Sequence, residues 1–241
     1  MTMALESMEG NDRLEARLRP PEPTNFGLYG RPTIIHTPRT LTQVRALLAT
    51  PEQFNRTATD PGTRLVTVAG DGVSAPTTVE LSTESSLAKA AGAVNVDRFK
   101  MACVGGRFGG VTRSLDVPTS APALTGAHLG TNGVVELFDT NTCALKLVGD
   151  RVKFARESNC GRCVPCREGS KQLVDLLREI YDGSYEASKL RELTRVIRES
   201  SVCEFGQAAP RPITTALNEF ESEIAAHAEG RCPSGTCNRG S

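Results

Sequence analysis

Cysteine is the residue type in this sequence whose spacing most clearly points to chemistry. Three of the eight cysteines, Cys160, Cys163 and Cys166, form the run CGRCVPC, in which two residues separate each cysteine from the next. Such gaps let consecutive thiolates converge on one inorganic core, and a [4Fe–4S] cluster takes four cysteine thiolates. Cys203, in SSVCEFGQAAPRP, is the candidate for the fourth ligand. The spacing therefore predicts a metal centre held by these four residues.

A structural zinc site is the alternative interpretation of the same four cysteines. Zinc sites usually contain pairs of CxxC motifs, whereas three cysteines in one run and one distant cysteine fit a cluster better. Gly161 permits close backbone approach, and Pro165 stiffens the loop. Arg162 and Arg167 would favour the more negative reduced state of a cluster and raise its potential, or they are solvated surface charges.

The other four cysteines carry weaker signals. Cys103 and Cys143 lie in apolar stretches and are expected to be small buried residues. Cys232 and Cys237 belong to CPSGTC, in a polar C-terminal tail that is expected to fray. They are interpreted as free thiols, with a disulfide or part of a second metal site as alternatives.

The histidines do not add a catalytic site. His36, His128 and His227 have no Cys or Glu partner at ligand spacing, so each is expected to lie at the surface or to form a hydrogen bond. No Ser/His/Asp order, HExxH motif or isolated Cys/His nucleophile pair stands out. The chain is therefore not expected to hold a self-contained catalytic site.

Composition narrows the class of protein. The 241 residues include 28 basic and 28 acidic side chains, a formal net charge of +0, which argues against a general nucleic-acid binder. No apolar run reaches the length of about 18 residues that a membrane-spanning helix needs. The polar N-terminus lacks the apolar segment of a secretory signal, so metal ligation is a stronger expectation for the cysteines than disulfides.

The elements upstream of the cysteine run are predicted to form a small mixed sheet. RLVTVAGDG, PTTVELS, FKMACVGG and GVVELFD have the composition of strands, and ESSLAKAAGA that of a short helix ending at Gly92. The loop GGRFGG lacks the spacing and the Lys-Ser/Thr of a phosphate-binding loop and is expected to supply turns and packing. Thr40 is expected to cap a short helix, LTQVRALLA, in a segment laid as a strap over the larger part.

From about residue 141 the pattern becomes helical. Apolar residues recur at helical spacing in four segments, NTCALKLVGDRVKFARES, GSKQLVDLLREIYDG, EASKLRELTRVIRESS and ITTALNEFESEIAAHA. Four amphipathic helices with short loops predict a small bundle. The cysteine run lies between the first and second helices, and Cys203 just before the fourth. Antiparallel packing could bring these two connections to one end of the bundle.

These motifs resemble the C-terminal iron–sulfur module of the 51-kDa flavoprotein (F) subunit of NADH:quinone oxidoreductase (respiratory complex I). Related subunits occur in NAD-linked hydrogenases and formate dehydrogenases. Asn159 departs from the family pattern as one extra residue before the first cysteine. The matching residues are Glu157, Ser158, Cys160, Gly161, Cys163, Pro165, Cys166, Arg167, Glu168, Gly169, Cys203, Gly206, Ala208, Ala209 and Pro210.

The resemblance implies an α+β fold and a division of the chain. Residues 1–60 resemble the end of a flavin-binding domain and would form the strap. Residues 61–140 resemble a β-grasp domain of the soluble-ligand-binding (SLBB) type. Residues 141–230 would form a four-helix domain carrying a [4Fe–4S] cluster on Cys160, Cys163, Cys166 and Cys203. Residues 231–241 would be a flexible tail, whose CPSGTC resembles an element from which some relatives continue into further clusters.

The resemblance also implies an electron-transfer role shared with other chains. The family's GRGGAGFPTG segment, which holds FMN and NADH, has no counterpart, and residues 36–40 read HTPRT where the family usually has NNVET. FMN and NAD are therefore expected only through a partner chain. The expected partners are flavin-binding and 2Fe–2S (24-kDa-like) subunits, without nucleic acid or direct membrane insertion. The expected location is the cytoplasm, including the cytoplasmic face of a membrane if partners bind there. A non-redox assembly or binding module with a structural four-cysteine zinc site is the alternative.

Overall fold

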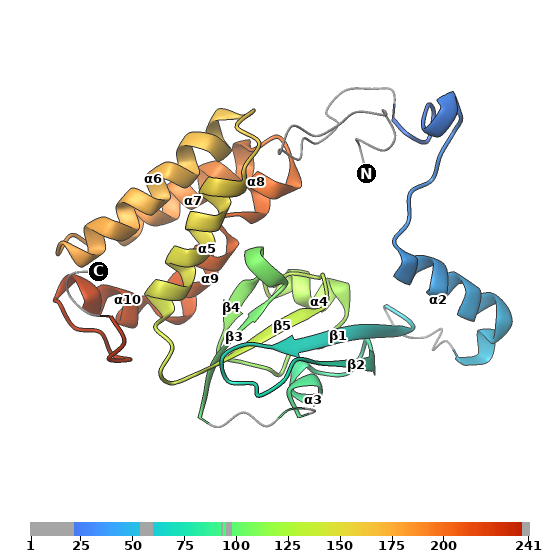
Figure 1. Cartoon of the computed structure of the whole chain (residues 1–241), viewed down its shortest axis with the longest axis horizontal. Coiled ribbons are helices and arrows are strands. Elements are labelled where there is room, and N and C mark those ends of the chain that lie inside the picture. Colours follow the sequence, from blue (N-terminus) through green and yellow to red (C-terminus); the bar gives the residue numbers. More distant parts are fainter. Residues whose placement is uncertain (1–21, 54–59, 93, 95–97, 238–241) are drawn as a thin grey trace.

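A computed structural model describes residues 22–53, 60–92, 94 and 98–237 of the chain. A mixed sheet forms one part of the molecule, and helices from the C-terminal half pack beside it (Figure 1). The fold is therefore α+β, as predicted. Of residues 1–60, which were compared with the end of a flavin-binding domain, residues 1–21 and 54–59 lie outside the described residues, as do residues 238–241.

The sheet has five strands in the order β2-β1-β5-β3-β4. β1 is antiparallel to β2, with Val66 opposite Val79, and parallel to β5, with Val68 opposite Val135. The first and last strands are thus neighbours at the centre, an arrangement that fits the predicted β-grasp sheet. The strands are β1 (Thr63–Ala69), β2 (Thr77–Ser82), β3 (Phe99–Val104), β4 (Gly110–Thr112) and β5 (Val134–Asp139).

Two elements of this region were not predicted. β4 has only three residues, all buried between β3 and a later helix, so it is too short to show the alternation of a strand. The helix α4 (Ala121–Gly126) lies in the Pro/Ser/Thr-rich segment between β4 and β5. Its start does carry helix signals, because the Ser120 side chain accepts a hydrogen bond from Ala123 N–H and Pro122 lies in the first turn. The predicted short helix is present as α3 (Leu87–Ala91).

The helical region differs from the predicted four-helix arrangement at its C-terminal end. Phe220, with φ −132° and ψ 23°, interrupts the fourth predicted helix, and the short α8 precedes that helix. The Phe220 ring is fully buried, and the Arg113 guanidinium lies 4.0 Å from its centroid. The helices are α5 (Ala144–Ser158), α6 (Val164–Tyr181), α7 (Ala187–Ser200), α8 (Glu204–Ala208), α9 (Arg211–Glu219) and α10 (Glu221–Ala228).

One hydrophobic core joins the sheet to the helices. Met101, Val111 and Phe138 from the sheet pack in the same cluster as Leu173 of α6 and Phe220. A second cluster fills the remaining space around the sheet with residues of β1, β5, α3 and α4. The boundary predicted at residue 140 falls on the β5–α5 connection, and the shared core continues across it.

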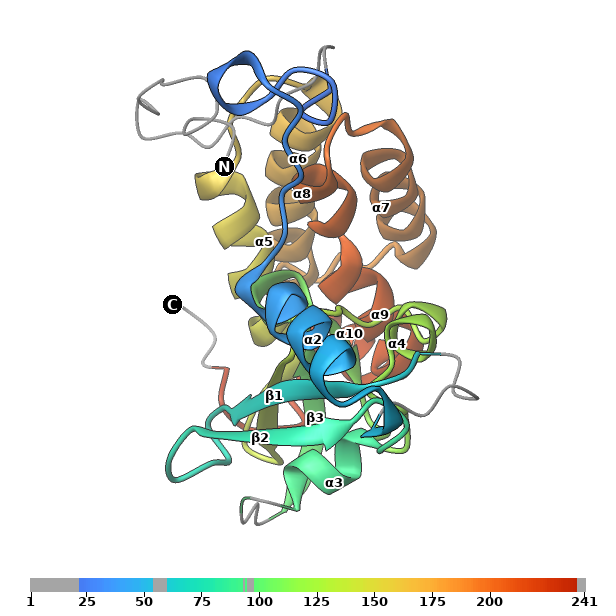
Figure 2. The ribbon, with the colours of Figure 1, turned by 90° about the vertical axis from the view of Figure 1, so that its right-hand side faces the viewer.

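The described part of the strap includes α2 (Pro38–Ala49), which lies beside the β1 end of the sheet (Figure 2). Thr37 rather than Thr40 caps this helix, since its side chain accepts from Thr40 N–H and Pro38 takes the first helical position. Gln43 Nε2 donates to Thr63 Oγ1 at 3.0 Å. The apolar residues of α2 remain largely exposed, with Leu48 at 80 %.

Two short 3₁₀ turns, Leu28–Gly30 and Pro51–Gln53, complete the described strap. Of the helices in the described part of the chain, none is long and apolar enough to cross a membrane.

Candidate iron–sulfur site

The four predicted ligands lie at two helix starts and in the loop before one of them. Cys160 lies in the connection from α5 to α6, Cys163 is the N-cap of α6, and Cys166 lies in the first turn of α6. Cys203 is the N-cap of α8, in the connection that leaves α7. Cys166 is buried, and the other three cysteines are partly exposed.

The structure brings these two connections together. Burial raises the pKa of Cys166 to about 12, and the charges of Cys163, Cys203 and Cys160 add to the increase. Burial opposes ionisation of Cys163 as well, but hydrogen bonds from the backbone of Val202 and Cys166 outweigh it and lower the pKa of this thiol. Sulfurs from both connections therefore interact, and their mutual repulsion as thiolates is what a bound metal centre would relieve.

The N-terminal end of α6 supplies partial positive charge beside the cysteine thiolates. The N-cap residues of α6 and α8 are cysteines, Cys163 and Cys203, and neither side chain forms a capping hydrogen bond of normal geometry. The first backbone N–H groups of α6, an 18-residue helix, remain directed towards the cysteines that surround its start. The positive end of a helix dipole stabilises anionic groups such as thiolates. The donor set and this local field fit an anionic cluster.

Gly206 allows α8 to approach the start of α6. A Cβ at this position would lie 2.5 Å from Ser201 Oγ and 2.6 Å from Ser201 Cβ, closer than real side chains approach, and 3.0 Å from Cys166 Cβ, a tight contact. The Ser201 hydroxyl is buried and makes no hydrogen bond of normal geometry to the described residues. It lies close to Cys163 and contributes to the lowered pKa of that thiol. The glycine of the later family motif is therefore required by close packing at the site.

Asn159, the extra residue relative to the family pattern, holds the loop in place. Its Nδ2 donates to the Arg156 carbonyl at 2.7 Å and to the Ala155 carbonyl at 3.3 Å, which satisfies the end of α5. Its Oδ1 accepts from Gly161 N–H at 2.9 Å, and Arg167 Nη1 donates to the Gly161 carbonyl at 2.7 Å. The insertion thus adds a turn that leads from α5 into the cysteine run.

We expect Asn159→Ala to destabilise the loop by about 1 kcal/mol through the lost hydrogen bonds. Iron release in air from the reconstituted protein should become several-fold faster, because the loop carrying Cys160 opens more often. The measurement is the decay of visible absorption after exposure to air. Asn141→Ala is the matched control, since Asn141 makes a similar exposed turn with Asp139 away from this loop. Equal decay rates for the two variants would contradict the role given to Asn159.

The Gly-rich loop packs against the helices on either side of the predicted ligands. Phe108 of this loop lies edge-on to Phe205 of α8, with ring centroids 4.8 Å apart, and 5.7 Å from Phe154 of α5. Arg211 Nη1 donates to the Phe108 carbonyl at 3.2 Å. A cleft of about 620 Å³ lies between this loop, the segment 125–132 and α8–α9. The loop therefore joins the sheet to the helix that follows Cys203.

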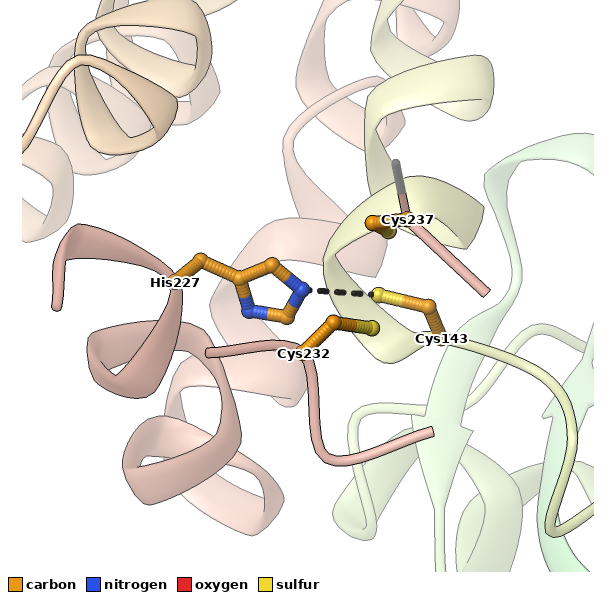
Figure 3. Close-up of side chains that lie close together, drawn as sticks. All are labelled: Cys143, His227, Cys232 and Cys237. Carbon is orange, nitrogen blue, oxygen red and sulfur yellow. Dashed lines mark hydrogen bonds between the residues drawn. The ribbon is translucent and has the colours of Figure 1, made fainter. Parts of the chain in front are cut away.

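A second group of possible ligands lies outside the predicted set. Cys143, His227, Cys232 and Cys237 place their ligand atoms within 4.8 Å of one another (Figure 3). Cys143 is buried, as expected. His227 is hydrogen-bonded, as expected, but it also has cysteine neighbours in space that its spacing in the sequence did not predict. The closeness of His227 to CPSGTC in the sequence was a usable signal, whereas nothing local connects either of them to Cys143.

Comparison with known proteins identifies the class. Residues 146–227, which contain all four predicted ligands, match the family described as the NADH-ubiquinone oxidoreductase-F iron–sulfur binding region. The fold and this match define an iron–sulfur-binding region of the kind found in that oxidoreductase component. The sequence fits the C-terminal part of the 51-kDa subunit, so the resemblance predicted from the cysteine motifs is confirmed.

Individual relatives extend the similarity to nearly the whole chain. The F subunit of the NADH-quinone oxidoreductase of Streptomyces coelicolor is 33% identical over 247 residues, covering 96% of this chain and 54% of the relative. The HndC subunit of the NADP-reducing hydrogenase of Solidesulfovibrio fructosivorans is 29% identical over 252 residues, covering 98% of this chain and 51% of the relative. The chain thus spans about half the length of these relatives.

A solved structure shares the fold. A chain of an NAD+-reducing [NiFe]-hydrogenase in the H2-reduced state superposes with a TM-score of 0.77 and 24% identity, over 88% of this chain and 38% of that chain. The sheet and the helical region therefore occur together in the same arrangement in a redox enzyme.

Proposed function

We propose that this chain is an electron-relay module in which Cys160, Cys163, Cys166 and Cys203 bind one [4Fe–4S] cluster. The observation that carries the proposal is the close packing of α8 on the start of α6, where a Cβ at Gly206 would lie 3.0 Å from Cys166 Cβ, so that the two cysteine-bearing connections meet. Support comes from their position inside the matched iron–sulfur region. A cluster of this type would accept and release one electron at a time.

The chain's own residues would hold, orient and shield this centre. The four thiolates supply the ligands, and the α6 N-terminus offsets their negative charge. Arg167 and Asn159 fix the loop that carries Cys160. Phe108 and Phe205 pack against each other at the start of α8, beside Cys203. Limited water access and nearby hydrogen bonds are the means by which a protein sets a cluster potential.

The proposed electron donor is a flavin bound by another chain, and the proposed acceptor is the next cluster in a partner subunit. A 24-kDa-like 2Fe–2S subunit is a further proposed partner. The relatives are named as subunits of NADH-quinone oxidoreductase and NADP-reducing hydrogenase, so partner subunits accord with the similarity. The exposed apolar face of α2, with Leu41, Val44 and Leu48, offers a surface for the flavin-binding partner. The proposed location is the cytoplasm. If partner subunits are anchored in a membrane, the chain would bind at its cytoplasmic face.

Anaerobic purification tests this proposal. We expect about four iron and four labile sulfide ions per chain, with an EPR signal that appears on reduction with dithionite. The same sample should lack that signal when oxidised. Absence of iron and sulfide after anaerobic reconstitution would contradict the proposal. Zinc that disappears in a Cys163→Ser variant would instead support the structural four-cysteine zinc site.

A further inference from the structure

Three segments that are distant in the sequence meet at a second cysteine-rich site. Cys143 is the N-cap of α5, His227 lies near the end of α10, and Cys232 and Cys237 lie in the chain that follows α10. Cys143 and His227 are 1 % and 4 % exposed, respectively. Figure 3 shows the three sulfurs gathered around the imidazole edge of His227.

Hydrogen bonding orients His227 as a metal ligand. Its Nδ1 lies 2.8 Å from the Glu223 carbonyl oxygen, which can only accept, so Nδ1 carries the proton. The unprotonated Nε2 then faces the Cys143 sulfur at 3.3 Å. Metal-binding histidines typically donate their other ring N–H to a carbonyl or carboxylate in this way. The Tyr181 ring packs edge-on against the imidazole, with centroids 5.6 Å apart.

A backbone N–H group in the first turn of α5 faces the Cys143 sulfur. Cys143 Sγ accepts from Lys146 N–H at 3.5 Å in the first turn of α5. The thiolate is the form of cysteine that binds metal ions.

We propose that Cys143, His227, Cys232 and Cys237 bind one tetrahedral zinc ion. Three thiolates and one imidazole are the ligand set of a closed structural zinc site. With Zn–S near 2.3 Å and Zn–N near 2.0 Å, tetrahedral geometry places the ligand atoms about 3.5–3.8 Å apart. The observed spread of no more than 4.8 Å is close to this arrangement. A group this compact has room for one ion and not for a cluster of four iron and four sulfide ions.

The zinc ion would fasten the segment after α10 to the rest of the molecule. Ser234, between the two tail cysteines, already bonds to the Thr142 carbonyl and to Glu223 Oε1, each at 3.3 Å. Glu223 also accepts from Lys100 Nζ at 2.8 Å and from Ala144 N–H at 2.9 Å. The tail therefore packs beside a buried ion pair that connects α10 with the sheet and with the start of α5.

This site is separate from the proposed cluster. Cys143 precedes α5, and Cys160 follows its end. The 15 residues of α5 span about 22 Å at 1.5 Å per residue. Removing one metal should therefore leave the ligands of the other in place, and the two proposals can fail independently.

The test compares metal contents of the whole chain, purified anaerobically from cells grown with added zinc. We expect about one zinc ion per chain in the wild type and at least a tenfold decrease in Cys237→Ser, with iron unchanged in both. Cys103→Ser is the matched control, because Cys103 is buried in β3 and belongs to neither site. It should retain both metals. Cys166→Ala should lose iron and keep zinc.

X-ray absorption at the zinc edge of the wild type tests the ligand set without any substitution. We expect three sulfur neighbours at about 2.3 Å and one nitrogen at about 2.0 Å. A wild type without stoichiometric zinc, a different ligand set, or zinc retained in a folded Cys237→Ser variant would each overturn the proposal. A Cys232–Cys237 disulfide found by mass spectrometry in the anaerobic protein would overturn it as well.

Discussion

Cys166→Ala is expected to abolish iron binding while the fold is retained. Cys166 is the buried member of the four predicted ligands and is influenced by the charges of the other three. A [4Fe–4S] cluster needs four protein ligands, and an alanine cannot replace a thiolate. We expect the iron content to fall at least about tenfold from about four per chain, with loss of the EPR signal of the reduced protein. Elemental analysis measures the iron content, and EPR of the reduced, anaerobically prepared protein measures the cluster signal.

Cys103→Ala is the control for this prediction. Cys103 is also a fully buried cysteine, but it lies in β3 and packs in the core. Its replacement should cost stability through lost packing and leave the iron content unchanged. If Cys166→Ala kept its iron and its EPR signal, the assignment of the four ligands would be wrong. Equal loss of iron in both variants would show that general destabilisation, rather than a missing ligand, is responsible.

The second large effect is expected for Phe220→Ala. The ring is fully buried between α9 and α10 and contacts the Arg113 guanidinium. Truncating a buried phenylalanine usually costs about 3–5 kcal/mol, because it removes apolar contacts and leaves a cavity. We expect a decrease of this size in the free energy of unfolding, measured by chemical denaturation and followed by circular dichroism. The surface variant Phe26→Ala, where the ring is 54% exposed, should change it by less than about 0.5 kcal/mol.

Hydrogen exchange in Phe220→Ala also tests how the sheet depends on the helices. Phe220 shares a core with Met101, Val111 and Phe138 of the sheet. Arg113, which follows β4, donates to the Glu219 carbonyl at 2.9 Å. Amide protection should therefore decrease in the sheet as well as in the helices. Decreased protection confined to α9 and α10 would show that the regions predicted as residues 61–140 and 141–230 unfold separately.

The sequence by itself determined the local elements and the motif chemistry. Strands β1, β2, β3 and β5 and helices α5, α6 and α7 were predictable, because alternation and helical spacing are written into neighbouring residues. The cysteine run and the Cys203 motif were sufficient to indicate the iron–sulfur region that comparison confirmed. Such signals can be recognised in the sequence because they depend on residues only a few positions apart.

Only the tertiary structure decided features that depend on contacts between distant segments. The interruption at Phe220 reflects burial of its ring against the sheet side of the core, which no helical pattern within residues 213–228 reports. β4 exists because β3 and α9 cover three residues on both sides.

The proposed zinc site shows why a feature that depends on contacts between distant segments cannot be predicted from the sequence alone. Cys143 lies at the start of α5, far in sequence from His227 and the tail cysteines, and each of these residues alone has the pattern of an ordinary core or tail position. Packing of α10 against α5 brings them within ligand distance. A spacing motif can predict ligands that one loop presents together. A site assembled from three segments depends on the packing of the whole core, and only the folded chain shows it.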